Sequence, residues 1–310
     1  MILGKTYFNG AENEKLYLGN TLIYSGVNTD FVMSVKTDNA GTSNNNQFTI
    51  PTTTGTYNYD VTTQDGQTLL ANTGDLTITF PTAGTYDVNI SGTFPKIFFA
   101  NTGDSLKILS VANLGIYGIG ELDQSYAFQG CRNLSATVGN ADNLNLITTA
   151  LEMFRYSDLS TLPTNLTLDS LVSGNGMFHD VALTSLPSAM ELPNLVNGYI
   201  MFSDSVITSL PSAMELPNLE NGTAMFARAL LTDLPSGMTL PNITAANWMF
   251  EVSTINTTRY SQLLIDMAAG NTNSNVPFHG GNSKYNASGQ TARNALVAKG
   301  WSITDGGLEV

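Results

Sequence analysis

Hydrophobic positions in the middle of the chain repeat with a constant period of 24 residues. Met-Phe recurs at that spacing from 153–154 to 249–250, and Leu-Pro does so from 162–163 to 234–235. A second motif, Leu-Pro-Asn, repeats in step with them from Leu192 onward. Three motifs with one period predict a repeat protein in which each unit forms one coil of the chain. Because a single coil cannot enclose its own leucines, we expect the coils to stack around a common core.

Each repeat also predicts one short strand. The residues before the first proline of a unit read Leu-Thr-Ser-Leu or a variant of it, and two prolines per unit exclude a long helix. We expect these segments to pair as parallel strands about 4.8 Å apart. The segments cover residues 158–162, 183–186, 207–210 and 231–234.

The Met-Phe pair is expected on the return side of each coil, pointing into the core. Each such buried side chain stabilises a repeat interior by about 1.5–3 kcal/mol, so packing explains the motif and no cofactor is implied. Phe178, Phe202 and Phe226 should line up in one continuous stack. In an earlier coil, Cys131 is expected to be a small buried residue at a turn.

Helix signals replace the repeat after residue 250. One helix is predicted over 260–270, with Thr257 or Thr258 as its cap, and a second follows a cap at Ser288 and ends at Gly300. Four residues of the second helix should point inward, namely Ala292, Ala295, Leu296 and Val297.

A closing strand is predicted at residues 301–304, beside 276–278. The end of a stack of coils exposes apolar surface and unpaired backbone groups, which a lid of this kind would cover. We therefore expect a small α/β cap at this end of the repeats.

The first hundred residues carry a different, strand-like pattern. Runs rich in β-branched and aromatic residues alternate with Gly, Pro, Asn and Thr clusters, at a spacing typical of an antiparallel sandwich. The strand that opens the repeat array is expected at 106–111. The runs of the sandwich cover residues 31–35, 47–50, 57–61, 76–80, 86–90 and 97–99.

An alternating pattern around Gly19-Asn20 predicts a β-hairpin ahead of the sandwich. An arm of this size is too small to fold alone, so we expect it to dock on another chain or on copies of itself. The residues expected to make this attachment are Lys15, Leu16, Tyr17, Leu18, Leu22 and Tyr24.

Together these patterns predict a mainly β fold in four parts: an arm (1–28), a β-sandwich (29–101), a repeat solenoid (102–250) and an α/β cap (251–310). The composition fits this fold, because 42% of the 310 residues are hydrophobic and can form a core. Only 12% are charged, and Thr, Asn, Ser and Gly take their place, which predicts a neutral polar surface.

Charge and motif content exclude several classes of partner and site. With 12 Lys and Arg against 25 Asp and Glu, the net charge of −13 disfavours nucleic acid and anionic membrane surfaces. No apolar run approaches the length of a membrane span, and the N-terminal pattern differs from that of an ordinary signal peptide. The single cysteine excludes an internal disulfide. No metal site is expected, because Asp65 and Asp75 lie in no compact cluster of oxygen ligands.

The repeats resemble a known family. The coils with Met-Phe and Leu-Thr-Ser-Leu-Pro, together with 127–134, resemble the BspA-like leucine-rich repeats of bacterial surface proteins and phage proteins. Residues 31–101 resemble the PKD/Ig-like sandwich that often precedes such repeats, although 63–66 read Thr-Gln-Asp-Gly where that module usually has Trp-Gly-Asp-Gly. The arm at 15–24 looks like N-terminal segments of phage fibre or tail proteins, and 299–307 is similar to the closing segment of such chains.

This resemblance implies adhesion or display on the surface of a virion. Because bacterial members carry leader sequences, it favours a bacteriophage virion structural protein, either a fibre or a head- or tail-decorating protein, for host attachment. The implied partners are other virion proteins through the arm and a host surface glycan or protein, with the chain acting as a homo-oligomer such as a trimer. The alternative is a bacterial cell-surface adhesin of the same repeat family. A third and less favoured hypothesis is a glycan-degrading enzyme.

The ionisable residues give little support to catalysis, and we expect no enzyme. His179 and His279 have no neighbour at triad or metal-ligand spacing and are expected on the surface. Glu191 and Glu215 share one repeat phase, where a solvated acidic rim is favoured over the carboxylate pair of a glycosidase.

The polar residues of the predicted strand face are the candidate binding surface. In three of the predicted strands the first leucine or isoleucine is followed by a threonine and then by a serine or an aspartate. Rows of hydroxyl groups on neighbouring coils would suit weak multivalent contacts with a glycan or a protein. The alternative is that these short side chains only solvate the exposed ladder. The candidate residues are Thr184, Ser185, Thr208, Ser209, Thr232 and Asp233.

Overall fold

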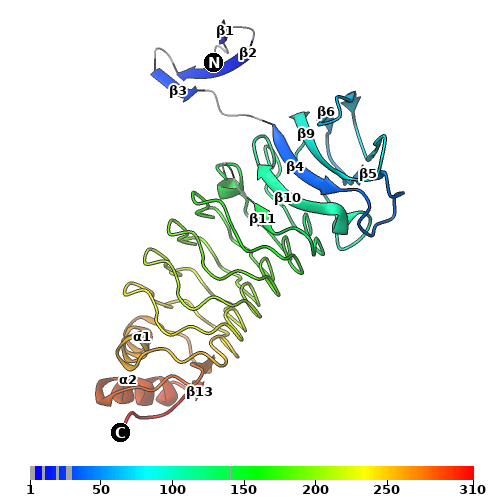
Figure 1. The fold of residues 1–310 in the computed structure, drawn as a ribbon. Coiled ribbons are helices and arrows are strands. Elements are labelled where there is room, and N and C mark those ends of the chain that lie inside the picture. The colour runs from blue at the N-terminus through cyan, green and yellow to red at the C-terminus, as the bar shows by residue number, and fades with distance from the viewer. Residues whose placement is uncertain (1–3, 9–10, 19–20, 26–29, 138, 140) are drawn as a thin grey trace.

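The computed structural model describes residues 4–8, 11–18, 21–25, 30–137, 139 and 141–310 (Figure 1). A small sheet at the N-terminus precedes a larger β region, and a long stack of coils leads from there to two helices near the C-terminus. The buried side chains of the β region and of the coils belong to one contiguous hydrophobic core.

The N-terminal arm is a three-stranded antiparallel sheet in the order β1-β2-β3. Its second and third strands form the predicted hairpin, with Leu18 paired to Thr21. The turn residues Gly19 and Asn20 lie outside the described residues. The strands are β1 (Gly4–Phe8), β2 (Ala11–Leu18) and β3 (Thr21–Ser25).

A six-stranded sheet dominates the next part of the chain, in the order β11-β10-β4-β9-β6-β7. The pattern of β4 explains its central place, because Phe31, Met33 and Val35 alternate with less buried residues and point into the core. A separate pair, β5 (Gln47–Ile50) and β8 (Leu76–Thr79), buries Phe48 and Ile78 in the same core. The large sheet contains β4 (Phe31–Lys36), β6 (Asn58–Thr63), β7 (Thr68–Asn72), β9 (Thr85–Thr93), β10 (Ile108–Asn113) and β11 (Ala136–Thr137).

The predicted fold class, a mainly β chain with an Ig/PKD-like sandwich and a leucine-rich-repeat solenoid, is wrong. Strands account for 21% of the chain and helices for 11%, so most residues lie in neither. The large sheet is mixed, because β10 pairs antiparallel with β4 but parallel with β11. The strand predicted to open a separate repeat array is thus part of the same sheet as β4, and the predicted run at 97–99 forms no strand.

A buried ion pair explains why β10 joins this sheet. The side chains of Lys107 and Asp104, just before β10, are fully buried. The Lys107 ammonium donates to the carbonyl oxygens of Ser43, Asn44 and Gln47 at 2.9–3.1 Å, in the loop that follows β4. Burial lowers the pKa of Lys107, and these contacts offset part of the cost of burying the charge. The pair therefore ties the loop after β4 to the turn that begins β10.

The coils contain no strands of the predicted kind. Between residues 147 and 256, every one of which is described, the chain forms turns and isolated bridges but no helix or strand. The predicted parallel ladder of 158–162, 183–186, 207–210 and 231–234 is absent as a sheet. Neighbouring coils are instead linked by single parallel bridges, namely Thr149 to Ser173, Ser173 to Asn197, Asn197 to Asn221 and Asn221 to Ala245.

The backbone around Met-Phe shows why no continuous sheet forms. The Phe202 amide donates to the Met225 carbonyl of the next coil at 2.9 Å, whereas the Met201 amide turns back to Gly198 within its own coil at 3.1 Å. Only alternate amides thus reach the next coil, and the same pattern recurs in the neighbouring coils. Ile200 and Asp204, on either side of Phe202, have φ of 46° and 58°, which is incompatible with an extended strand.

The phenylalanines form the predicted continuous stack. Phe178, Phe202 and Phe226 lie in register, with ring centroids 5.5 and 5.6 Å apart and planes within 9° of parallel. The column extends to Phe128 at one end and to Phe250 at the other. With Phe154, the column has six rings, and all six side chains are fully buried, as is Cys131 in the coil of Phe128.

Two helices follow the last coil, with caps one residue or more earlier than predicted. The α1 helix (Thr257–Gly270) is capped by Asn256, whose side chain accepts from the Arg259 amide. The α2 helix (Ala287–Ala298) is capped by Asn286 rather than by Ser288. An asparagine side chain accepts hydrogen bonds from the free backbone amides of the first helical turn, so each helix begins directly after its asparagine. Of the four residues predicted to point inward, Ala292 and Leu296 are buried, but Ala295 and Val297 are exposed.

The predicted closing strand is present at this end. β12 (Pro277–His279) and β13 (Ser302–Thr304) pair in parallel. β12 also continues the coil ladder, because the Phe250 amide donates to the carbonyl of His279 at 3.1 Å. Phe278 packs edge-on against Phe250 at 6.3 Å and so covers the last ring of the phenylalanine stack.

Candidate functional site

The predicted threonine face is exposed and flat. Thr208 and Thr232 are neighbours on adjacent coils, because the Thr232 amide donates to the Thr208 carbonyl at 3.2 Å. All six predicted binding residues are exposed, and none of them lines the hollows described below. Asp233 has a structural partner as well, because it accepts from the side chain of Asn256, the cap of α1, at 2.6 Å. Nothing in this arrangement tests whether the face binds a ligand.

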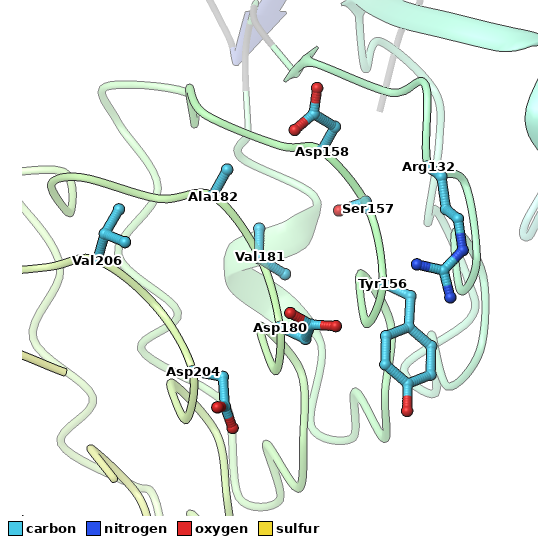
Figure 2. Close-up of a pocket in the computed structure, with 9 residues that line it drawn as sticks. All are labelled: Arg132, Tyr156, Ser157, Asp158, Asp180, Val181, Ala182, Asp204 and Val206. Atoms are coloured by element: carbon cyan, nitrogen blue, oxygen red, sulfur yellow. The ribbon is translucent and has the colours of Figure 1, made fainter. Parts of the chain in front are cut away.

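A hollow of about 270 Å³ lies beside this face (Figure 2). All nine lining residues lie two to four positions after a stacked phenylalanine, so four neighbouring coils contribute to it. Ala182, on its rim, precedes the predicted Thr184 by two residues. The lining residues are Arg132, Tyr156, Ser157, Asp158, Asp180, Val181, Ala182, Asp204 and Val206.

A second hollow, of about 310 Å³, continues from the first along the stack. The two share Asp204, and we call them together the trough. The lining of this second hollow combines small residues with one aromatic and several charged side chains. Its lining residues are Ser203, Asp204, Ala224, Ala227, Arg228, Trp248 and Glu251.

Asp204 is the electrostatic centre of the trough. Its carboxylate accepts from the Arg228 guanidinium and from the Ser203 hydroxyl, both at 2.8 Å. The ring nitrogen Nδ1 of His179 lies 3.7 Å from the same carboxylate. Partial burial opposes ionisation of this group, but the hydrogen bonds from Arg228 and Ser203 outweigh it and lower the pKa of Asp204. The side chain is therefore ionised at neutral pH.

An arginine and tyrosine cluster closes one end of the trough. The guanidinium groups of Arg132 and Arg155 lie 4.9 and 4.4 Å from the centre of the Tyr156 ring. Arg155 also donates to the Tyr156 hydroxyl and to the Glu152 carboxylate, at 2.6 Å each. Cation–π contacts and charge-assisted hydrogen bonds hold these side chains in one arrangement. The wall is thus fixed by residues of the chain itself.

Ser157 contributes a buried hydroxyl group to the trough. The residue is 5% exposed, and its side-chain oxygen has no hydrogen-bond partner among the described residues. Figure 2 shows this oxygen directed toward the neighbouring coil that carries Val181. At the equivalent repeat position, the Ser253 hydroxyl is satisfied by the Ala229 carbonyl at 2.8 Å. The hydroxyl of Ser205, also at this repeat position, likewise has no partner among the described residues but borders neither hollow, so Ser157 is distinguished by its place at the trough.

Trp248 stands at the other end of the trough with 56% of its surface exposed. Its φ of 54° places a bulky residue in the left-handed region, where side chains are disfavoured. Smaller residues occupy the equivalent position in two other coils, Gly176 and Ala224. The left-handed φ recurs at the equivalent residues Tyr126, Glu152, Ile200 and Ala224, so it belongs to the coil itself, and the exposed aromatic ring is what distinguishes Trp248.

The trough lacks the arrangement that nucleophilic catalysis requires. Ser203 donates its hydroxyl to Asp204, while Nδ1 of His179 lies 3.2 Å from the backbone carbonyl of Ser203 and 3.7 Å from the Asp204 carboxylate, and not at a hydroxyl. No hydroxyl is therefore activated by the imidazole as in a Ser-His-Asp triad. His179 is partly buried, contrary to the surface position predicted for it, and so is His279.

Searches for other kinds of site add two findings. In the part of the chain that the structure describes, no three His, Cys, Asp or Glu side chains come together as metal ligands would. None of the helices described combines the length and apolar character needed to span a bilayer.

Comparisons with protein-family models, with curated proteins and with solved structures gave no match to this chain. The resemblance to BspA-like and PKD/Ig-like proteins therefore stays a prediction.

Proposed function

We propose that this chain is a non-enzymatic structural protein of a bacteriophage virion that attaches to the host surface through the coil stack. The observation that carries the proposal is the trough, at which residues of differing chemistry lie at one phase of an otherwise constant repeat. His179, Ser203, Ala227 and Glu251 occupy one such position, directly after phenylalanines that do not vary. A constant core with a variable surface column is what a binding surface on a rigid scaffold requires.

The N-terminal arm supports an assembly role in this proposal. It forms its own three-stranded sheet, and the predicted attachment residues lie on its second and third strands. A sheet of three short strands has little core of its own and gains stability from docking. We therefore assign the arm to contacts with other virion proteins or with copies of this chain, for example in a trimer.

Two measurements test the proposal. Mass spectrometry of purified phage particles should detect the chain at a stoichiometric copy number. The purified chain, added in excess, should compete with those particles for adsorption to host cells. Recovery of the chain only from a bacterial envelope fraction would instead establish the alternative, a cell-surface adhesin. Release of sugar products from host glycans would contradict the non-enzymatic assignment.

A further inference from the structure

We propose that the trough binds an uncharged, hydroxyl-rich glycan, with Trp248 as a stacking platform and the Asp204–Arg228 pair as the hydrogen-bonding centre. The identification of this glycan with a host-surface component rests on the proposed function. The binding of a glycan by the trough does not rest on that function, because it is inferred from the chemistry of the lining residues.

Trp248 supplies the apolar contact that a sugar ring needs. Its indole is more than half exposed and borders a hollow whose other side is lined by Ala224 and Ala227. The small alanine side chains leave the face of the ring accessible. Aromatic rings combine a large apolar face with a polar edge, and the C–H face of a pyranose packs on such a surface.

The Asp204–Arg228 pair supplies hydrogen bonds in both directions. The carboxylate can accept about four hydrogen bonds, and two are already made by Arg228 and Ser203. The remaining lone pairs can accept from sugar hydroxyls. The Arg228 side chain is 66% exposed and bonds to Asp204 through one Nη1 hydrogen bond, so further N–H groups can donate to a ligand. Neighbouring hydroxyls of a sugar require this combination of acceptor and donor.

Ser157 is the independent observation that points to a ligand. Its hydroxyl is buried, borders the first hollow and has no partner within the described chain. A hydroxyl of the ligand, or a water that it holds in place, would satisfy this group. The trough thus offers unused hydrogen-bonding capacity at both of its hollows, with Asp204 between them.

The charge of the trough argues for an uncharged ligand. Its lining contains four carboxylates and two guanidinium groups, a net charge of −2. Sialylated, sulfated or phosphorylated glycans would bring like charges close to the carboxylates, which opposes binding. The charged lining residues are Arg132, Asp158, Asp180, Asp204, Arg228 and Glu251.

The test uses the full chain and a panel of immobilised neutral oligosaccharides, each paired with its sialylated or sulfated form. We expect binding to at least one neutral member and weaker binding to its anionic partner. Trp248→Ala and Asp204→Asn should each weaken this binding by roughly tenfold or more, since each removes a buried or stacking contact. Leu230→Ala is the matched control, because Leu230 is equally exposed at 56% but lines neither hollow.

Three outcomes would overturn the inference: no binding to any neutral glycan, preference for the anionic forms, or binding that both trough variants leave unchanged. Circular dichroism of each variant checks folding, and Trp248→Phe keeps an aromatic face and should retain most of the binding. Particle adsorption separates this result from the proposed function. Glycan binding without any competition for host cells would contradict the virion role alone, whereas competition without glycan binding would contradict the glycan alone.

Discussion

Removal of one ring from the phenylalanine stack tests whether the coils share a close-packed core. Phe202 is fully buried and packs between Phe178 and Phe226 at 5.5 and 5.6 Å. A Phe202→Ala change removes the ring and leaves a cavity, which costs about 3–5 kcal/mol in the free energy of unfolding. Phe202→Leu keeps most of the apolar volume but loses two ring pairs, each of which contributes about 0.5–1.5 kcal/mol beyond burial. We expect the leucine variant to lose about 1–3 kcal/mol.

The assay is urea unfolding, followed by circular dichroism and by tryptophan fluorescence. The two signals report on different parts of the chain, so coincident transitions are needed before a single free energy is assigned. Leu230→Ala, at an exposed apolar position, serves as the control and should change stability by no more than about 0.5 kcal/mol. A loss below about 1 kcal/mol for Phe202→Ala would show that the ring is not packed as described and would refute the reasoning.

Three further predictions concern backbone strain, the thiol and the acid side chain. Val252 is a β-branched residue with φ of 63° and is 44% exposed, so the Val252→Gly change should raise the free energy of unfolding by about 1 kcal/mol. The Leu230→Gly change, at a residue outside the left-handed region, should lower it in the same urea titration. Burial raises the pKa of the Cys131 thiol well above its usual value, so Ellman's reagent should label it at pH 8 only after unfolding; rapid labelling of the native chain would disprove its burial. Because the pKa of Asp204 is lowered on folding, its ionised form stabilises the fold above about pH 4, and this contribution is lost as the pH falls through the folded pKa. The Asp204→Asn change should therefore lower the free energy of unfolding by about 1 kcal/mol at pH 7. The difference in stability between this variant and the native chain should shrink in acid.

The sequence predicted packing better than it predicted hydrogen bonding. Burial of Met-Phe follows from the period alone, and the stack of Phe178, Phe202 and Phe226 is present. The strands predicted in each coil are not, because the choice between an extended and a turning backbone depends on φ. Residues such as Ile200 and Val252 have left-handed φ that no propensity would assign to a β-branched side chain. Contacts with the next coil hold them there, and a single-sequence pattern does not contain that information.

The strand predicted to open the coils is present as β10 and pairs in parallel with β11, but its antiparallel pairing with β4 was not predicted, for a similar reason. The sequence shows a strand at 106–111, and the structure has β10 at Ile108–Asn113. Its partner, β4, lies more than 70 residues away in sequence, so local patterns say nothing about the pairing. The buried ion pair of Lys107 with Asp104 that holds the intervening loop is equally invisible, since charged residues are normally predicted on the surface.

The trough was not predicted from the sequence, because residues at its repeat positions vary from coil to coil. His179 and its repeat equivalents Ser203 and Glu251 differ in chemistry, and variation within one array predicts a solvent position without a role. The binding surface was predicted at the repeated threonines instead, because their regular spacing places hydroxyl groups in rows. A receptor that recognises one ligand needs a different side chain at each contact, whereas the scaffold needs the same one in every coil.

Once the phenylalanine stack is known, the position of the trough can be found in the sequence, because its lining residues lie at variable repeat positions close to the constant phenylalanines. Phe202 and its equivalents fix the spacing of the coils, and the residues two positions after them, such as Asp204 and Arg228, inherit that spacing on the surface. Their 2.8 Å hydrogen bond therefore joins residues 24 positions apart without any flexible loop between them. A ligand that spans several coils would meet side chains already held in place, so little conformational entropy would be lost on binding.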